Sequence, residues 1–350
     1  MSVAISPETA VNREVIISAD SHVMEPPDLW SKALSSRFGD QAPSFPPHKV
    51  GEGFQHHPGG QNPHERVKEM AQDGVSAEVL YPTLGLGLFS LDDPALQEAC
   101  FRVYNDWLLE YCQPALDRLV GIAAISVYNI DQALKELRRC RDGGLKGALI
   151  WEAPHPDLPF PSSHYEPLWA AAQDLDMPIS LHILTGHGYV KNRPEGVERY
   201  RGSVNHKTTE AVNALFDFTH YGILDRYPEL KLVMVEHEVG WLPYYVQQWD
   251  YYFRRFRKVN PLPIDKAPGE YIARQVYCTF FNDPIGTKLL NWWGAENCMW
   301  SNDFPHENST WPRSREVIAR DLGNLPEATR ARLVRDNVVR LYKMGVPEPV

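Results

Sequence analysis

Three features that would assign the chain to a familiar class of protein are missing from its sequence. No run of about 18 apolar residues is present, so no helix is expected to span a membrane. The five cysteines are scattered and form no Cys-x-x-Cys pair, which favours a reducing compartment and argues against a cysteine-based zinc site. No block of lysine and arginine occurs, and the formal net charge is −10, so a nucleic-acid-binding surface is not expected.

The beginning of the chain, MSVAISPETAVNREV, also lacks the charged and apolar segments of a signal peptide. We therefore expect a cytoplasmic protein. Its partner is expected to be a small molecule rather than a nucleic acid or a membrane.

Short apolar runs alternate with longer amphipathic segments along the chain. We predict eight strands: Val15–Asp20, Ala77–Pro82, Leu119–Val127, Gly147–Glu152, Pro178–Leu184, Lys231–His237, Val276–Phe281 and Cys298–Asp303. Helical patterns lie between them, at Pro94–Leu116, Ile130–Arg141, Tyr165–Asp174, His206–Arg226, Trp241–Val259 and Pro326–Met344. Nearly continuous apolar strands are covered on both faces, so this alternation predicts a single (β/α)8 TIM barrel over residues 1–350. An open doubly wound sheet is the main alternative.

The segment from residue 25 to residue 63 interrupts this alternation. It is rich in proline, glycine and histidine and shows no periodicity. Because it follows the first strand, we expect it to form a lid or pocket wall over the mouth of the barrel. Its histidines are more simply explained as solvated side chains than as metal ligands: His48, His56, His57 and His64.

Acidic and imidazole side chains recur at the carboxyl ends of the predicted strands, which is where barrels of this class carry their chemistry. They follow strands one, four, five, six and eight: Asp20, His22, Glu152, His182, Glu236, His237, Asp303 and His306. Asp20 and His22 are two residues apart, so both side chains point the same way from an extended strand. Buried charges need compensation, and a shared zinc, manganese or iron ion provides it for such ligands.

Five segments, in order along the chain, resemble a known family: ISADSHVMEPPDLW, VSAEVLYPT, PISLHIL, LVMVEHEVGWLPYYVQQWD and MWSNDFPHENSTWP. They are similar to the amidohydrolase superfamily, in the amidohydrolase-2 branch that contains aminocarboxymuconate semialdehyde decarboxylase and related aromatic-acid decarboxylases and hydrolases. The resemblance implies one divalent metal held by four residues: Asp20, His22, His182 and Asp303. It also implies that His237 and Asp303 take part in proton transfer.

The activity implied by this resemblance is decarboxylation or hydrolysis of a small carboxylate or carbonyl compound, aromatic or cyclic, with the help of metal-bound water. The same residues serve both reactions, so they do not choose between them. Arg66 falls near an arginine that binds a substrate carboxylate in some relatives, and a position on a helix surface is the equally weighted alternative.

A second metal is the main alternative to a mononuclear site. In dinuclear members of the superfamily, a carboxyl group from strand four bridges two metals, and histidines from strands five and six bind the second. Glu152 and His237 match that pattern, with Glu236 and His187 as further candidates. Two irons would favour a non-heme diiron monooxygenase. A non-catalytic, metal-containing binding protein is the least favoured possibility, because structural metal sites are usually closed and rich in cysteine.

Aromatic residues near the predicted mouth favour a substrate with an aromatic or apolar body. The residues assigned to the substrate pocket are Trp30, Tyr81, Trp151, Trp241 and His306. Packing in the core or in the long loop is the alternative for most of the aromatic ones. The aromatic-rich helix at Trp241–Arg257 packs either on the barrel or on a second subunit, so a homodimer is possible.

Overall fold

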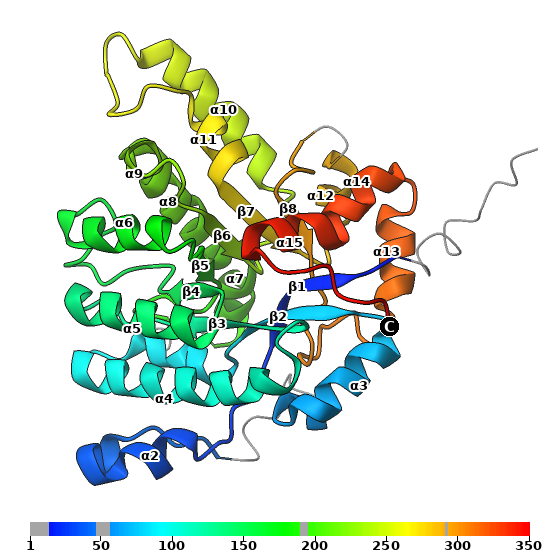
Figure 1. The fold of residues 1–350 in the computed structure, drawn as a ribbon. Coiled ribbons are helices and arrows are strands. Elements are labelled where there is room, and N and C mark those ends of the chain that lie inside the picture. Colours follow the sequence, from blue (N-terminus) through cyan, green and yellow to red (C-terminus); the bar gives the residue numbers. More distant parts are fainter. Residues whose placement is uncertain (1–13, 47–56, 190–194, 291–292) are drawn as a thin grey trace, which may run out of the picture.

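The computed structural model describes residues 14–46, 57–189, 195–290 and 293–350. Eight parallel strands form a barrel with helices around it (Figure 1). The strands are β1 (Ile17–His22), β2 (Ala77–Tyr81), β3 (Leu119–Ala124), β4 (Gly147–Ile150), β5 (Ile179–His182), β6 (Leu232–Val235), β7 (Val276–Phe280) and β8 (Cys298–Trp300). Each pairs with the next in chain order, and all eight coincide with predicted strands.

Main-chain hydrogen bonds between the first and last strand regions close the barrel. The Asp303 amide donates to the Asp20 carbonyl at 3.0 Å, and the His22 amide donates to the Phe304 carbonyl at 2.7 Å. An open sheet would leave these edges apart, so the doubly wound alternative is wrong. The (β/α)8 prediction is confirmed.

The helices between the strands follow the predicted alternation. They are α2 (Leu29–Phe38), α3 (Pro63–Asp73), α4 (Pro94–Cys112), α5 (Ile130–Gly143), α6 (Glu166–Asp174), α7 (Val197–Arg201), α8 (Lys207–His220), α9 (Ile223–Arg226), α10 (Leu242–Phe256), α11 (Pro268–Gln275), α12 (Pro284–Leu289), α13 (Ser314–Leu322), α14 (Glu327–Ala331) and α15 (Asn337–Tyr342). Local chemistry sets their ends. The Asp93 side chain accepts from two free amides at the start of α4, and Gly144 ends α5 in the left-handed region with φ 113°. None of the helices in the described ranges has the length and hydrophobicity that a bilayer crossing requires.

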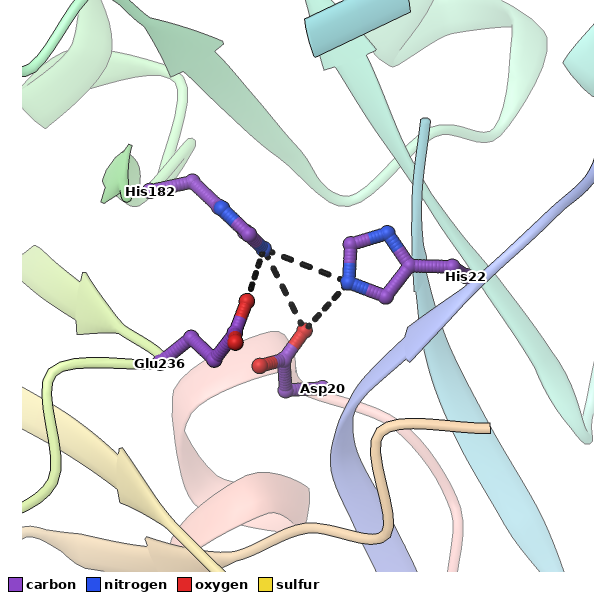
Figure 2. A group of neighbouring side chains, drawn as sticks. All are labelled: Asp20, His22, His182 and Glu236. Atoms are coloured by element: carbon purple, nitrogen blue, oxygen red, sulfur yellow. Dashed lines mark hydrogen bonds and ion pairs between the residues drawn. The ribbon is translucent and has the colours of Figure 1, made fainter. Parts of the chain in front are cut away.

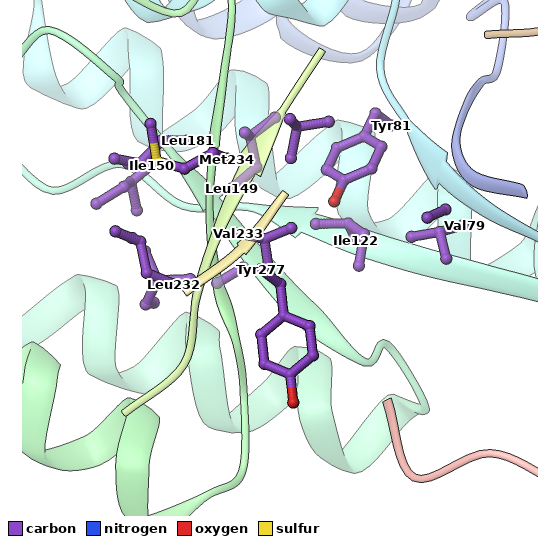
Figure 3. Packing of buried hydrophobic residues seen from close by; sticks show 14 of the residues in the cluster. Val79, Tyr81, Ile122, Leu149, Ile150, Leu181, Leu232, Val233, Met234 and Tyr277 are labelled. Carbon is purple, nitrogen blue, oxygen red and sulfur yellow. The ribbon is translucent and has the colours of Figure 1, made fainter. Parts of the chain in front are cut away.

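Apolar side chains of the strands fill the core that supports the barrel. Figure 3 shows part of this packing, with Val79, Ile122, Leu149, Leu181 and Val233 among the labelled residues. All five are completely buried. The five cysteines are also buried and free, as expected for a chain without disulfides. A rigid core of this kind fixes where the strand ends point.

The segment after β1 is described in part. Residues 47–56, which include His48 and His56, lie outside the described residues. His57 packs between the rings of Phe304 and Trp311, with centroids 4.7 and 4.6 Å away. The Met24 amide donates to the Gly60 carbonyl at 2.8 Å, which fastens this segment to the end of β1. Its role as a lid stays a prediction.

The predicted aromatic-rich helix is α10, which extends beyond the barrel (Figure 1). Its outer face exposes four aromatic side chains: Tyr244, Tyr251, Tyr252 and Phe256. Trp249 on the same helix packs instead against His220 of α8, with ring centroids 5.3 Å apart. One face of α10 therefore packs on the protein, and a homodimer stays a prediction.

Candidate metal centre and active site

Four polar side chains from three strands meet at the carboxyl end of the barrel (Figure 2). Asp20 and His22 come from β1, His182 ends β5, and Glu236 directly follows β6. The first three are completely buried, and Glu236 is 9% exposed. The period-two geometry of a strand brings Asp20 and His22 to one side, as predicted.

The distances among these side chains are longer than those of strong hydrogen bonds and suit ligands that share an ion. Asp20 Oδ1 lies 3.5 Å from His22 Nε2 and 3.7 Å from His182 Nε2, and the two Nε2 atoms are 3.3 Å apart. Ligand atoms about 2.0–2.2 Å from a common ion lie about 2.8–3.6 Å from one another. The group therefore has nearly the spacing of a metal site.

Backbone carbonyls orient both imidazoles toward Asp20. His22 Nδ1 lies 2.8 Å from the Pro82 carbonyl, and His182 Nδ1 lies 2.7 Å from the Ile183 carbonyl. A carbonyl only accepts, so each Nδ1–H donates and Nε2 is the ring nitrogen that faces the centre of the group. Metal-binding histidines are oriented in the same way.

A second group shares His22. Asp303 Oδ1 lies 3.4 Å from His22 Nε2 and 2.9 Å from His306 Nδ1. The His306 ring stacks on His22 with centroids 4.0 Å apart, and its Nε2 lies 3.3 Å from Thr83 Oγ1. Asp303 is completely buried, whereas the side chain of His306 is 12% exposed. His306 therefore connects Asp303 with the surface.

The electrostatics of the two groups reflect buried carboxylates. Burial raises the pKa of Asp20. Burial, together with His306 and His182, holds the pKa of His22 well below its usual range. Burial alone would lower the pKa of His182, but Asp20 and Glu236 raise it to about 9. A cation would compensate these carboxylates without a proton.

Unsatisfied oxygen atoms point to the same compensation. Neither carboxylate oxygen of Asp20 or Asp303 forms a hydrogen bond of good geometry with any described residue. Buried polar atoms without partners are rare and costly, and they concentrate at functional sites. The residues present therefore fit a divalent cation.

The backbone around this site is strained. Four residues other than glycine adopt the left-handed region just after β5, β6 and β8: Leu184 (φ 71°), Glu236 (φ 64°), Glu238 (φ 58°) and Asp303 (φ 55°). Each such residue costs about 1–3 kcal/mol. Glu236 is held in place by its amide, which donates to Thr279 Oγ1 at 2.8 Å. The strain accompanies the placement of Glu236 and Asp303 in the two groups.

The candidates for a second metal do not form one cluster among the described residues. Glu152 and His237 bond to each other through Oε1 and Nε2, and both side chains are completely buried. His187 Nε2 instead lies 3.0 Å from Asp92 Oδ1. Glu236 is the member of this set that joins the group of Asp20.

Arg66 takes a position that neither interpretation of the sequence predicts. It is completely buried, so the surface interpretation is wrong. Its Nε pairs with Glu78, its Nη1 donates to the His22 carbonyl at 2.7 Å, and its Nη2 reaches the Phe304 carbonyl at 3.4 Å. All three nitrogen atoms of the guanidinium therefore face protein acceptors rather than a substrate.

Asn302 joins Arg66 and Glu78 in a buried network. Its Oδ1 accepts from Ser18 and Ser21 of β1 at 3.0 and 2.8 Å, and its Nδ2 lies 3.3 Å from both Glu78 and Asp73. Sequence analysis missed this network. A signal was present, because Glu78 is a charged residue inside an otherwise apolar strand.

A cavity of about 420 Å³ opens beside the metal-binding group. Its lining includes Glu236, Lys207 of α8, Trp241 and Phe281. Trp241 therefore lies at a cavity, as predicted, and its Nε1 donates to the His237 carbonyl at 2.9 Å. Aromatic walls beside a charged centre suit a small aromatic acid.

The structure places three other predicted pocket residues in packing roles. Trp30 is completely buried and donates to the Cys100 carbonyl at 2.9 Å, which ties α2 to α4. The Tyr81 hydroxyl lies 3.0 Å from Ser180 Oγ, and Trp151 Nε1 donates to the Tyr165 hydroxyl at 3.1 Å. All three satisfy their polar atoms inside the protein, which favours packing, and their assignment to the substrate pocket stays a prediction.

Comparison with known proteins identifies the family. The family model described as amidohydrolase matches residues 20–344. The chain belongs to the amidohydrolase family. Its relatives include gamma-resorcylate decarboxylases of Rhizobium sp. (strain MTP-10005) and Rhodococcus jostii (strain RHA1), each 26% identical, over 323 and 299 residues. These alignments cover 80% of this chain and 86% and 87% of the relatives. The predicted family is confirmed.

Solved structures share the fold. An amidohydrolase from Mycobacterium avium subsp. paratuberculosis K-10 matches with a TM-score of 0.75 and 19% identity over 94% of this chain and 99% of that one. A 2,6-dihydroxybenzoate decarboxylase matches at 0.70, with 20% identity over 95% and 100%. A dihydroxybenzoic acid decarboxylase from Polaromonas sp. JS666, with bound manganese and 2-nitroresorcinol, matches at 0.70, with 20% identity over 94% and 97%.

Proposed function

We propose that the protein is a metal-dependent decarboxylase of a small aromatic acid. One divalent cation per chain, manganese in the first place, is held by Asp20, His22, His182 and Asp303. The observation that carries the proposal is the buried Asp20 carboxylate, which faces two oriented imidazoles and forms no hydrogen bond of good geometry with any described residue. The decarboxylase relatives and the manganese in the Polaromonas structure support it.

A bound cation would neutralise and orient the carboxylate of the substrate. The protein's own residues must then supply a proton, because decarboxylation replaces a ring C–CO2 bond with a C–H bond. The electron pair of the broken bond stays on the ring carbon, which takes the proton as CO2 leaves. Asp303 is placed to deliver that proton, and His306, 2.9 Å from Asp303 Oδ1 and partly exposed, is placed to return it from solvent.

His237 has a supporting part in this proposal. Its Nε2 is held by Glu152, and its carbonyl accepts from Trp241 at the cavity. The pair therefore fixes the end of β6 and the Trp241 side chain that lines the cavity. The same contact weakens the diiron monooxygenase alternative, because Glu152 and His237 bond to each other. The hydrolase alternative uses the same residues as the decarboxylase. Release of CO2 distinguishes the two, because hydrolysis releases none.

The test uses the purified full chain, stripped with a chelator and reloaded with manganese. It is incubated with 2,6-dihydroxybenzoate, the acid in the name of the decarboxylase structure above, and with other hydroxybenzoates. A further substrate is 5-carboxyvanillate, because a 5-carboxyvanillate decarboxylase from Sphingomonas paucimobilis also shares the fold. The expected result is manganese-dependent release of CO2 together with the corresponding phenol. If manganese-loaded protein released no CO2 from any aromatic acid, or consumed oxygen instead, the proposal would be wrong.

A further inference from the structure

Glu236 differs from its neighbours on the loop after β6 in what its carboxylate contacts. Glu238 accepts from the amides of Phe281 and Asn282 at 3.2 Å each, so it braces the loop after β7. The two carboxylate oxygens of Glu236 face other side chains. Oε2 lies 3.7 Å from His182 Nε2, and Oε1 lies 3.6 Å from Lys207 Nζ.

Two positions are therefore open to the Glu236 carboxylate. One is the group of Asp20, His22 and His182, toward which it points in Figure 2. The other is Lys207, the first residue of α8, whose side chain is one-third exposed in the cavity. Of the four residues in Figure 2, Glu236 is the one that also lines this cavity, so a substrate arriving through it meets Glu236 first.

We propose that Glu236 is an additional ligand of the same cation, and that the substrate carboxylate displaces it onto Lys207. The inference rests on the proposed function and adds a fifth side chain to its four ligands. Three carboxylates and two neutral imidazoles carry a charge of −3. Together with a divalent ion they have a net charge of −1, which repels an incoming anion. Transfer of Glu236 to Lys207 removes one of those charges from the ion.

The number of ligands that an ion can bind also indicates that Glu236 must leave when the substrate binds. Five protein ligands would leave little room on a manganese ion for a substrate. An aromatic acid that binds through its carboxylate and a neighbouring hydroxyl needs two places. Glu236 is the ligand that leaves, because its loop borders the cavity and because Lys207 offers it a second ion pair.

The test measures manganese affinity without substrate, from the electron paramagnetic resonance signal of the free ion. Glu236→Gln removes the charge, and Glu236→Gly also relieves the left-handed backbone, which glycine adopts without steric cost. We expect both to weaken manganese binding by about 10- to 100-fold, at least as much as the loss of a residue that only orients a ligand. Without metal, we expect the melting temperature of the Glu236→Gly variant to be no lower than that of the wild type.

The matched control is Glu238→Gln, on the same loop, which is expected to bind manganese within about twofold of the wild type. Lys207→Met is expected to leave manganese affinity undiminished and to raise KM for the aromatic acid, because displaced Glu236 loses its partner. A crystal structure with manganese should place a Glu236 oxygen within about 2.5 Å of the ion.

The outcomes separate this inference from the proposed function. Wild-type manganese affinity in both Glu236 variants, or a manganese-loaded structure with Glu236 more than 3.5 Å from the ion, would overturn the inference and leave the decarboxylase intact. A wild type that binds manganese through Glu236 but decarboxylates no aromatic acid would retain the ligand and overturn the function. A wild type that binds no divalent metal would overturn both.

Discussion

Two regions of this molecule bury carboxylates to the same degree and treat them differently. At the barrel mouth, the oxygens of Asp20 and Asp303 lack hydrogen bonds of good geometry among the described residues. In the network of Arg66 and Asn302, Glu78 pairs with the guanidinium and Asp73 accepts from the amide and hydroxyl of Ser314. The barrel mouth therefore has negative charges that a cation must balance, whereas the charges in the network of Arg66 and Asn302 balance one another.

The difference assigns a separate task to each region. The Arg66 network bonds to the backbone of His22 and Phe304, and Asn302 bonds to β1, so it holds the two strands that carry Asp20 and Asp303. Its charges contribute to the folded state with or without metal. The charges at the mouth cost stability until a cation binds. Substitutions that remove a charge should therefore have opposite effects in the two regions.

The largest effect is expected for Arg66→Met, which leaves Glu78 as an unpaired buried carboxylate. We expect the free energy of unfolding to fall by about 3–5 kcal/mol, with or without manganese. Urea unfolding with and without a chelator measures it. The double substitution Arg66→Met/Glu78→Gln should recover part of the loss, and a loss seen only in the presence of manganese would contradict this separation of the regions.

Asp20→Asn should act in the opposite sense on stability. It removes a buried charge that His182 balances only in part in the metal-free protein. The chelated variant should therefore unfold no more easily than the wild type, and its free energy of unfolding should be higher by up to about 1–3 kcal/mol. Manganese affinity should fall by at least about 100-fold, more than for a residue that only orients a ligand. A variant that unfolds more easily without metal but binds manganese normally would assign Asp20 to the structural region.

Trp30→Phe is expected to have the smallest effect. It deletes the bond to the Cys100 carbonyl and keeps the ring between α2 and α4, which should cost about 0.5–1.5 kcal/mol. Turnover and KM should stay unchanged, because the side chain packs between α2 and α4 rather than in the active site. A raised KM with unchanged stability would return Trp30 to the substrate pocket.

The strands and their order follow from the sequence because the hydrophobic pattern specifies both. The same pattern places Asp20, His22 and His182 at the strand ends, and the period of a strand fixes their common direction. The grouping of Glu236 with Asp20 does not follow from it. That grouping depends on a left-handed backbone just after β6, which no residue type at this position announces.

Long-range packing accounts for the contacts that the sequence did not predict. The sequence suggests that Arg66 binds a substrate carboxylate or lies on a helix surface, but its guanidinium reaches the His22 carbonyl 44 positions away. Glu152 and His237 are the right residue types for metal ligands. Their pairing with each other, across 85 positions, depends on how far each side chain extends from β4 and β6, which β5 separates. Sequence spacing carries no information on either distance.

We propose that the carboxylates of Asp20 and Asp303 at the mouth of the barrel bind a catalytic cation. Titration of chelated protein with manganese, followed by decarboxylation rate at each occupancy, tests it most directly. We expect the rate to rise in proportion to occupancy and to stop rising at one manganese per chain. Decarboxylation at the full rate by the chelated protein would contradict it.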